Sequence, residues 1–138
     1  MKKKLNLVYF KKLDFQRQSI NELKENFNLI ELNNPDELTI NEKKKIDILF
    51  APLGHYFGTK FFNNCPNLKI IASNTTGHPH IDVKSANSRN IKVITLKNDN
   101  IFLDQITPTA EHTIGLMISI IRRYNEAFNA PLNYQWNR

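Results

Sequence analysis

Short apolar runs and amphipathic segments alternate along the first hundred residues. The apolar runs lack a regular two-residue alternation with polar positions, which is the pattern of parallel strands buried on both faces. The predicted strands are 5–9, 29–32, 46–51, 70–72 and 91–96. The segments between them predict helices at 15–27, 57–64 and 83–89, and a polar helix or loop ending at 45. Strands that alternate with helices predict an α/β fold, and five such units suit a flavodoxin-like, doubly wound, parallel five-stranded sheet.

The pattern changes after Leu96. A polar connector, 97–105, leads to Thr107 and Pro108, which suit the N-cap and the first position of a helix. Glu111 falls in the first turn, where a negative charge interacts favourably with the helix dipole. The connector is therefore expected to lead into a further helix.

This last helix is predicted to run to about Phe128 and to be unusually apolar. Its apolar side chains cover an arc of roughly 200°, against the ≳100° stripe of an ordinary surface helix. They are Ala110, Ile114, Met117, Ile121, Tyr124 and Phe128, flanked by Leu116, Ile118 and Ile120. We expect a flavodoxin-like domain at 1–98, and at 99–138 a connector and a helix that another domain or another copy of the chain must cover.

The stretch 69–82 combines a predicted strand, a loop and a helix start. The loop 74–77 follows the strand, and Asp82 is placed to cap the next helix. Ligands of open α/β sheets bind where loops leave the carboxyl ends of strands, and backbone N–H groups aimed at one point suit an anion. Gly77 is expected to adopt a positive φ and to let a ligand approach the backbone. The alternative is an ordinary strand–helix turn in which Gly77 supplies only backbone freedom.

Size and composition are those of one globular domain. The chain has 138 residues, of which 41% are hydrophobic and 23% charged. The formal charge of +6 comes from dispersed lysines without interleaved aromatic residues, so no nucleic-acid partner is expected. The apolar run 5–10 is too short for a signal peptide, and no run could span a membrane. Cys65 is the only cysteine, so we expect a reducing compartment, the cytoplasm.

Two groups of polar residues are candidates for a metal site or for acid–base catalysis. His78, His80 and Asp82 suggest a metal site, but two histidines two residues apart form a weak signal without a third ligand at a familiar spacing. Hydrogen bonds to nearby backbone are the simpler interpretation. Glu111 and His112 would be adjacent on a helix and point about 100° apart, which argues against an acid–base pair. We therefore predict no catalytic residue and no metal site in this chain.

Three motifs in order resemble the N-terminal part of the D-isomer-specific 2-hydroxyacid dehydrogenases, the phosphoglycerate dehydrogenase-like family. They are Cys-Pro-Asn-Leu-Lys-Ile-Ile-Ala-Ser-Asn-Thr-Thr-Gly-His-Pro-His-Ile-Asp at 65–82, Asn-Ile-Lys-Val at 90–93 and Thr-Pro-Thr-Ala-Glu-His-Thr-Ile-Gly-Leu-Met at 107–117. The resemblance covers essentially 46–138. It implies a flavodoxin-like substrate domain packed against an NAD-binding Rossmann domain, with NAD as cofactor and a small 2-hydroxy or 2-keto acid as substrate.

The resemblance also implies roles for individual residues. The loop 74–77 would bind the substrate carboxylate through its main chain, with a second loop bordering the substrate. The implied substrate-binding residues are Leu53, Gly54, Asn74, Thr75, Thr76 and Gly77. Thr76 and Thr109 would lie near the nicotinamide end of the cofactor. The helix 108–128 would cross to the NAD domain and help to form a homodimer.

Two features depart from the family pattern. His78 and Pro79 stand where a hydroxyl or apolar residue, followed by an acidic or amide residue, is usual. The four glycines, at 54, 58, 77 and 115, form no Gly-x-Gly-x-x-Gly. The family's catalytic Arg, Glu and His also have no counterpart here, so we expect this chain alone to be inactive.

An alternative is a stand-alone, dimerising module that binds an acidic metabolite or a protein without catalysis. The genomic sequence beyond Arg138 separates the two hypotheses. A continuing frame with Gly-x-Gly-x-x-Gly favours the dehydrogenase, and a stop codon favours the module.

Overall fold

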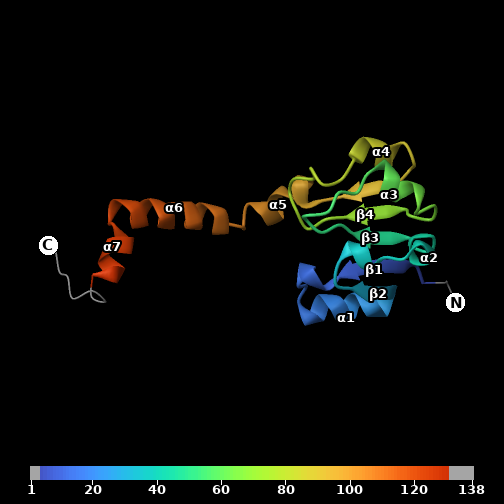
Figure 1. Cartoon of the computed structure of the whole chain (residues 1–138), viewed down its shortest axis with the longest axis horizontal. Coiled ribbons are helices and arrows are strands. Elements are labelled where there is room, and N and C mark those ends of the chain that lie inside the picture. Colours follow the sequence, from blue (N-terminus) through green and yellow to red (C-terminus); the bar gives the residue numbers. More distant parts are fainter. Residues whose placement is uncertain (1–3, 131–138) are drawn as a thin grey trace. The chain divides into compact units, whose positions relative to one another are not determined.

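A computed structural model describes residues 4–130 of the chain. Its centre is a sheet of five parallel strands in the order β2-β1-β3-β4-β5, which can be followed in Figure 1. The strands are β1 (Asn6–Phe10), β2 (Asn28–Leu32), β3 (Ile48–Phe50), β4 (Ile70–Ala72) and β5 (Lys92–Ile94). This order is that of flavodoxin-like folds, so the predicted fold is confirmed.

Successive side chains of each strand point to opposite faces of the sheet, and both faces are packed. On one face, the ten-residue helix α1 (Arg17–Asn26) packs against side chains of the strands. The side chains of this layer include Leu7, Tyr9, Ile48, Phe50 and Ile70 from the strands, and Ile20 and Leu23 from the helix. The other face holds the larger core, with Val8, Phe10, Leu49 and Ile71 from the strands. A sheet covered on both faces explains why its strands read as continuous apolar runs.

Short helices cover this second face. They are α3 (Thr59–Asn63) and α4 (Val83–Asn87), whose residues Phe62 and Ala86 are buried in this core, whereas the four-residue α2 (Ile40–Lys43) has no buried residue. The Ser85 hydroxyl joins the last two helices, since its oxygen lies 2.8 Å from the Thr59 hydroxyl. The Arg89 guanidinium donates to Ser85 Oγ and to Asn63 Oδ1, both at 2.8 Å. This polar network fixes the spacing of α3 and α4.

The segment between β3 and α3 is a loop that contacts the loop after β4. The predicted helix 57–64 begins two residues late because Phe57 pairs with that loop instead. The Phe57 N–H donates to the His80 carbonyl at 2.8 Å, and the Asp82 N–H donates to the Phe57 carbonyl at 2.9 Å. The Asp82 carboxylate accepts the Ser85 N–H at 2.9 Å, so the predicted cap of α4 is confirmed.

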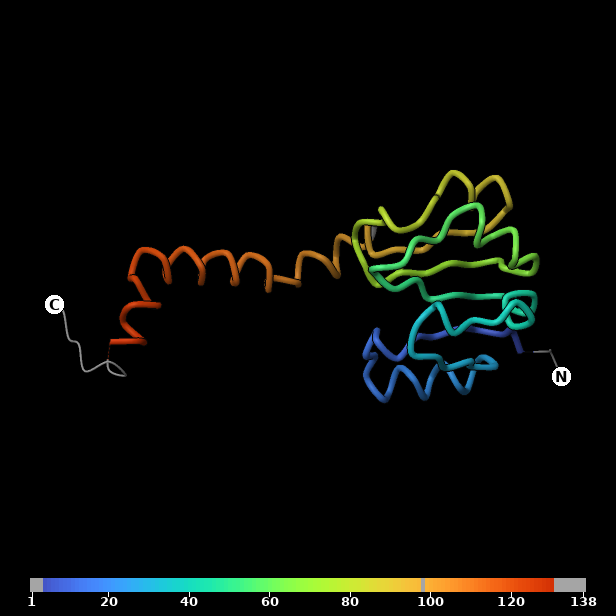
Figure 2. The backbone as a smooth tube through the Cα atoms, in the orientation of Figure 1, coloured from blue at the N-terminus to red at the C-terminus, as the bar shows by residue number. Residues whose placement is uncertain are grey.

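The described residues fall into two compact units, one ending at Asn98 and the other beginning at Asp99. The second unit contains α5 (Asn100–Leu103), α6 (Pro108–Ile121) and α7 (Tyr124–Asn129). The predicted single helix 108–128 is therefore wrong: it ends at Ile121, and the chain turns before α7 (Figure 2). Arg123 adopts a left-handed conformation with φ 51°, which interrupts the helix.

The start of α6 also differs from the prediction. Thr107 is the N-cap residue, but its hydroxyl caps no backbone N–H and donates instead to the Glu111 carboxylate. The apolar side chains of α6 and α7 are exposed, from 40% for Tyr124 to 76% for Ile120. None of the described helices is long and apolar enough to cross a membrane.

Candidate functional site

A hollow of about 310 Å³ lies where the chain leaves β1, β3 and β4 at their carboxyl ends. It is lined by Lys12, Leu13, Pro52, Leu53 and Asn74. Each strand contributes through the loop that follows it, because the carboxyl ends of parallel strands share one edge of the sheet. Ligands of open α/β sheets bind at such an edge. The hollow therefore brings together the predicted residues Leu53 and Asn74, which are 21 positions apart in the sequence.

The loop after β4 leaves its backbone donors open. Within the described part of the chain, none of the five N–H groups from Asn74 to His78 donates a hydrogen bond. Asn74, Thr76 and Gly77 are exposed, so these donors are not sealed inside the fold. Most backbone N–H groups of a folded protein are paired, and a run of five unpaired donors can bind an anion.

The loop is nevertheless held in place through its carbonyls and hydroxyls. The Thr75 carbonyl accepts the Leu96 N–H at 3.1 Å, and the Thr75 hydroxyl donates to the Gly77 carbonyl at 2.6 Å. Ser73, which is 6% exposed, places its hydroxyl 2.9 Å from that of Thr75. The side chain of Thr75 is thus engaged within the protein, and its contribution to the site is to shape the loop.

One expectation about the loop is wrong. Gly77 does not have a positive φ; among the described glycines only Gly54 does, at 86°. A Cβ added at Gly77 would lie 3.7 Å from Pro79 Cδ, an ordinary van der Waals distance. The helix after the loop, α4, has only five residues, so its dipole contributes little positive potential to the site. The unpaired backbone donors remain as the feature suited to an anion.

Lys12 brings a positive charge to the hollow and was missed in the sequence analysis. Its ammonium donates to the Leu53 carbonyl at 3.3 Å and lies 2.9 Å from His55 Nδ1. Lys12 therefore links the turn after β1 to the loop after β3. The signal in the sequence is the position of Lys12, because a basic residue three positions after the first predicted strand (5–9) lies near the carboxyl edge of the sheet.

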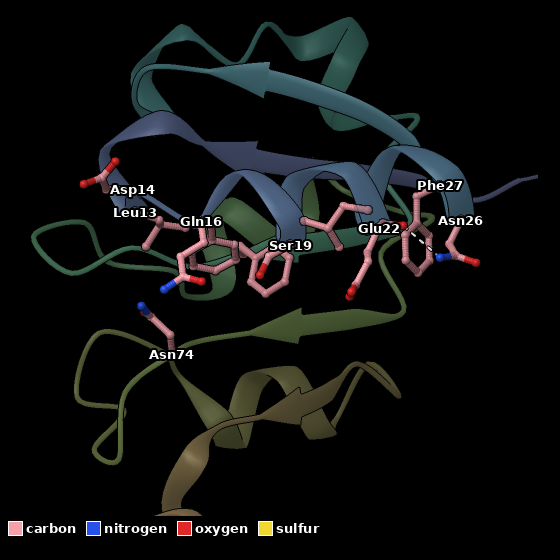
Figure 3. A pocket seen from close by; sticks show the side chains of 11 residues that line it. Leu13, Asp14, Gln16, Ser19, Glu22, Asn26, Phe27 and Asn74 are labelled. Atoms are coloured by element: carbon pink, nitrogen blue, oxygen red, sulfur yellow. Dashed lines mark hydrogen bonds between the residues drawn. The ribbon is translucent and has the colours of Figure 1, made fainter. Parts of the chain in front are cut away.

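Asn74 also lines a second hollow, of about 590 Å³, beside α1 (Figure 3). Its apolar part is formed by Leu13, Phe15, Leu23, Phe27 and Phe50, and its polar part by Asp14, Gln16, Ser19, Glu22 and Asn26. The amides of Gln16 and Asn74 point toward one another across this hollow in Figure 3. Leu13 and Asn74 are thus shared by the two hollows at this edge.

A sequence model of the D-isomer specific 2-hydroxyacid dehydrogenase catalytic domain matches residues 7–113, most of the chain. The chain belongs to this family. The resemblance stated from the three motifs is therefore confirmed, and the fold described above is the one the family resemblance implied.

Relatives of known activity share the same part of the sequence. A glyoxylate reductase of Thermofilum pendens is 31% identical over 103 residues, which are 75% of this chain and 29% of the reductase. Formate dehydrogenase 1 of Saccharomyces cerevisiae is 28% identical over 82 residues, 59% of this chain and 20% of the enzyme. The chain thus spans less than a third of the length of these curated relatives.

Solved structures agree on the fold. The structure of D-lactate dehydrogenase from Aquifex aeolicus, complexed with NAD and lactic acid, matches with a TM-score of 0.78 at 16% identity. The match covers 97% of this chain and 38% of the lactate dehydrogenase. At this level of identity the comparison establishes a shared fold.

Three further features of the described residues bear on chemistry: the candidate metal ligands, the Cys65 thiol and the polar residues at the start of α6. No group of three or more His, Cys, Asp or Glu residues between residues 4 and 130 could hold a metal ion. Burial raises the pKa of the Cys65 thiol to about 11, so the thiol stays protonated and unreactive near neutral pH. Thr109, Glu111 and His112 lie on α6, in the second unit, with exposed side chains.

Proposed function

We propose that this chain is the substrate-binding part of an NAD-dependent oxidoreductase acting on the CH–OH group of a D-2-hydroxy acid. This proposal rests on the five unpaired backbone N–H groups from Asn74 to His78. They bind the carboxylate that 2-hydroxy and 2-keto acids share, by main chain rather than by side chain. Membership of the dehydrogenase family supports the assignment of the reaction.

Residues around the loop complete the site in this proposal. The Lys12 ammonium adds positive charge to the hollow, which favours an anionic ligand. Leu53 is 58% exposed and borders the substrate with an apolar surface. Gly54, at φ 86°, gives its loop a turn that other residues adopt with strain. Because hydroxy and keto acids present the same carboxylate, this loop holds substrate and product alike.

In this proposal NAD is bound mainly outside this chain, and only its nicotinamide end lies next to the substrate site. When bound, it accepts a hydride from the substrate carbon that carries the hydroxyl group. The chain has no Gly-x-Gly-x-x-Gly to hold the dinucleotide. Thr76 and Thr109 are exposed, and neither hydroxyl makes a hydrogen bond within residues 4–130, so both are open to contact the nicotinamide end. Catalytic groups are assigned to the part of the dehydrogenase outside this chain.

The apolar surface of the second unit is proposed to form a homodimer. Large side chains such as Ile114, Met117 and Ile121 are 56%, 57% and 75% exposed on α6. Exposed apolar surface of this extent is rare on a monomer and marks an interaction site. We also place the protein in the cytoplasm, where the buried, unpaired thiol of Cys65 stays reduced.

Calorimetric titration tests the proposed ligand. D-lactate and D-lactamide have the same size and differ in the carboxylate, so the chain should bind D-lactate and not D-lactamide. Lys12→Met should weaken lactate binding about two- to fivefold, whereas Lys11→Met at the neighbouring exposed position should leave it unchanged. Equal binding of lactate and lactamide, or an equal effect of the two lysine variants, would contradict the proposal.

A further inference from the structure

His80 is buried beside the loop with an unusual pattern of hydrogen bonds. It is 7% exposed, and its Nε2 lies 3.2 Å from the Ser73 hydroxyl oxygen. Its Nδ1 is also buried and has no hydrogen-bond partner among the described residues. Buried polar atoms are nearly always paired, so an orphan ring nitrogen next to a candidate binding loop calls for an explanation.

The positions of the protons follow from the acceptors. The Gly77 carbonyl can only accept, so the single proton of the Thr75 hydroxyl is donated to it. Toward Ser73, the Thr75 oxygen can then only accept, and so can the Ala51 carbonyl, which lies 3.1 Å from the Ser73 hydroxyl. When Ser73 gives its proton to either of these acceptors, the bond to His80 needs a proton on Nε2. His80 is therefore neutral, with Nε2–H as donor and a bare lone pair on Nδ1.

This arrangement is favoured by the surroundings of the ring. Protonation of Nδ1 would place a charge and an unpaired N–H inside the fold. Burial is the main cause that lowers the pKa of His80, and the neighbouring His78 acts in the same direction, while the Ala51 carbonyl opposes it. A pKa below the ordinary value keeps the ring of His80 neutral at neutral pH.

The resulting relay runs from His80 to the binding loop. When the Ser73 proton goes to Thr75 and not to the Ala51 carbonyl, Nε2–H donates to Ser73, Ser73 donates to Thr75, and Thr75 donates to the Gly77 carbonyl. In a planar trans peptide, the C=O of Gly77 and the N–H of His78 point in opposite directions. The bond to Gly77 therefore turns the His78 N–H away from Thr75 and leaves it open to a ligand.

We propose that His80 is a positioning residue, whose Nε2–H orients the anion-binding loop through Ser73 and Thr75. The inference rests on the proposed function, since it concerns the loop to which carboxylate binding is assigned. A histidine suits this place because its ring fills a buried space while offering one donor in a fixed direction. His80 itself touches no substrate.

Two substitutions of His80 distinguish the effect of its N–H donor from the effect of its ring. His80→Phe fills the space without a donor and should weaken D-lactate binding about tenfold. His80→Gln restores an N–H donor and should recover binding to within about threefold of wild type. Thr75→Val breaks the relay at its last step, leaves His80 in place and should weaken binding as His80→Phe does. If His80→Phe fails to fold, Thr75→Val tests the last step of the relay, and the tautomer of the wild-type His80 ring tests the first.

The test is a titration of the full 138-residue chain and its variants with D-lactate, combined with long-range 15N–1H spectra of the histidine rings. We expect the Nε2–H tautomer for His80 and the order of affinities given above. Wild-type affinity in folded His80→Phe or in Thr75→Val, or an Nδ1–H tautomer, would overturn the inference and leave the proposed function standing. No lactate binding by the wild-type chain would overturn both.

Discussion

Two glycines near the candidate site have different backbone requirements. Gly54 has φ 86°, and an added Cβ there would meet no atom within 4 Å, so the cost of a side chain is conformational. Gly54→Ala should lower the free energy of unfolding by about 1 kcal/mol, and Gly54→Asn by less, because asparagine tolerates the left-handed region. Gly77→Ala is the control, with no left-handed strain. Urea denaturation measures all three, and an equal loss at both glycines would contradict this account.

His80 should make stability depend on pH. Its pKa is lowered from the ordinary 6.5, so the unfolded chain binds a proton more readily than the folded protein. The contribution of the neutral ring is complete above pH 6.5 and is lost as the pH falls toward the lower pKa of the folded state.

His80→Phe removes this titration, so its unfolding free energy should fall less than that of wild type between neutral pH and pH 5 (an illustrative range below the ordinary pKa). Denaturation curves at several pH values measure the difference. Parallel pH profiles for wild type and His80→Phe would show that the ring does not titrate differently in the folded state.

For single residues, the sequence predicted which residues lie in the candidate loops better than it predicted their backbone conformations. The loop 74–77 was recognised from the apolar run before it, but a positive φ was assigned to Gly77 and belongs to Gly54. Both glycines follow a predicted strand, and their φ values depend on tertiary contacts of the loops. The relay through His80 was equally inaccessible, because it requires that Ser73 and Thr75 converge with the ring in space.

Substitutions on helix α6 test the proposed dimer. Ile114→Asp should convert an associated chain into a monomer, because burying an unpaired carboxylate in an apolar interface costs several kcal/mol. Ser119→Asp, on the opposite side of the same helix, should leave association unchanged. Sedimentation equilibrium measures the mass of each variant. A monomeric wild-type chain, or an equal effect of the two substitutions, would contradict the proposed interface.

At the scale of elements, apolar runs were sufficient to place all five strands and the order in which they alternate with helices. The break between α6 and α7 was not predictable in the same way. The apolar spacing continues through Tyr124 and Phe128, and no glycine or proline marks the turn. An arginine in the left-handed region, Arg123, ends the periodic pattern without a local sequence signal.

The whole chain is expected to lack dehydrogenase activity when tested alone. Hydride transfer needs a bound nicotinamide and an acid–base group beside the substrate, and the proposal assigns both to a part outside this chain. Spectrophotometry with NAD and D-lactate should detect no turnover. An NAD-dependent rate that disappears on substitution of a residue in this chain would contradict the division of the site.

The central claim is that the backbone donors of residues 74–78 bind a carboxylate. The most direct measurement is a titration of the 138-residue chain with D-lactate, followed through its 1H–15N amide spectrum, with D-lactamide as the matched neutral ligand. The account predicts saturable shifts of the amides of Asn74 to His78 with lactate and none with lactamide. Lactate shifts that cluster elsewhere, with these five amides unchanged, would contradict it.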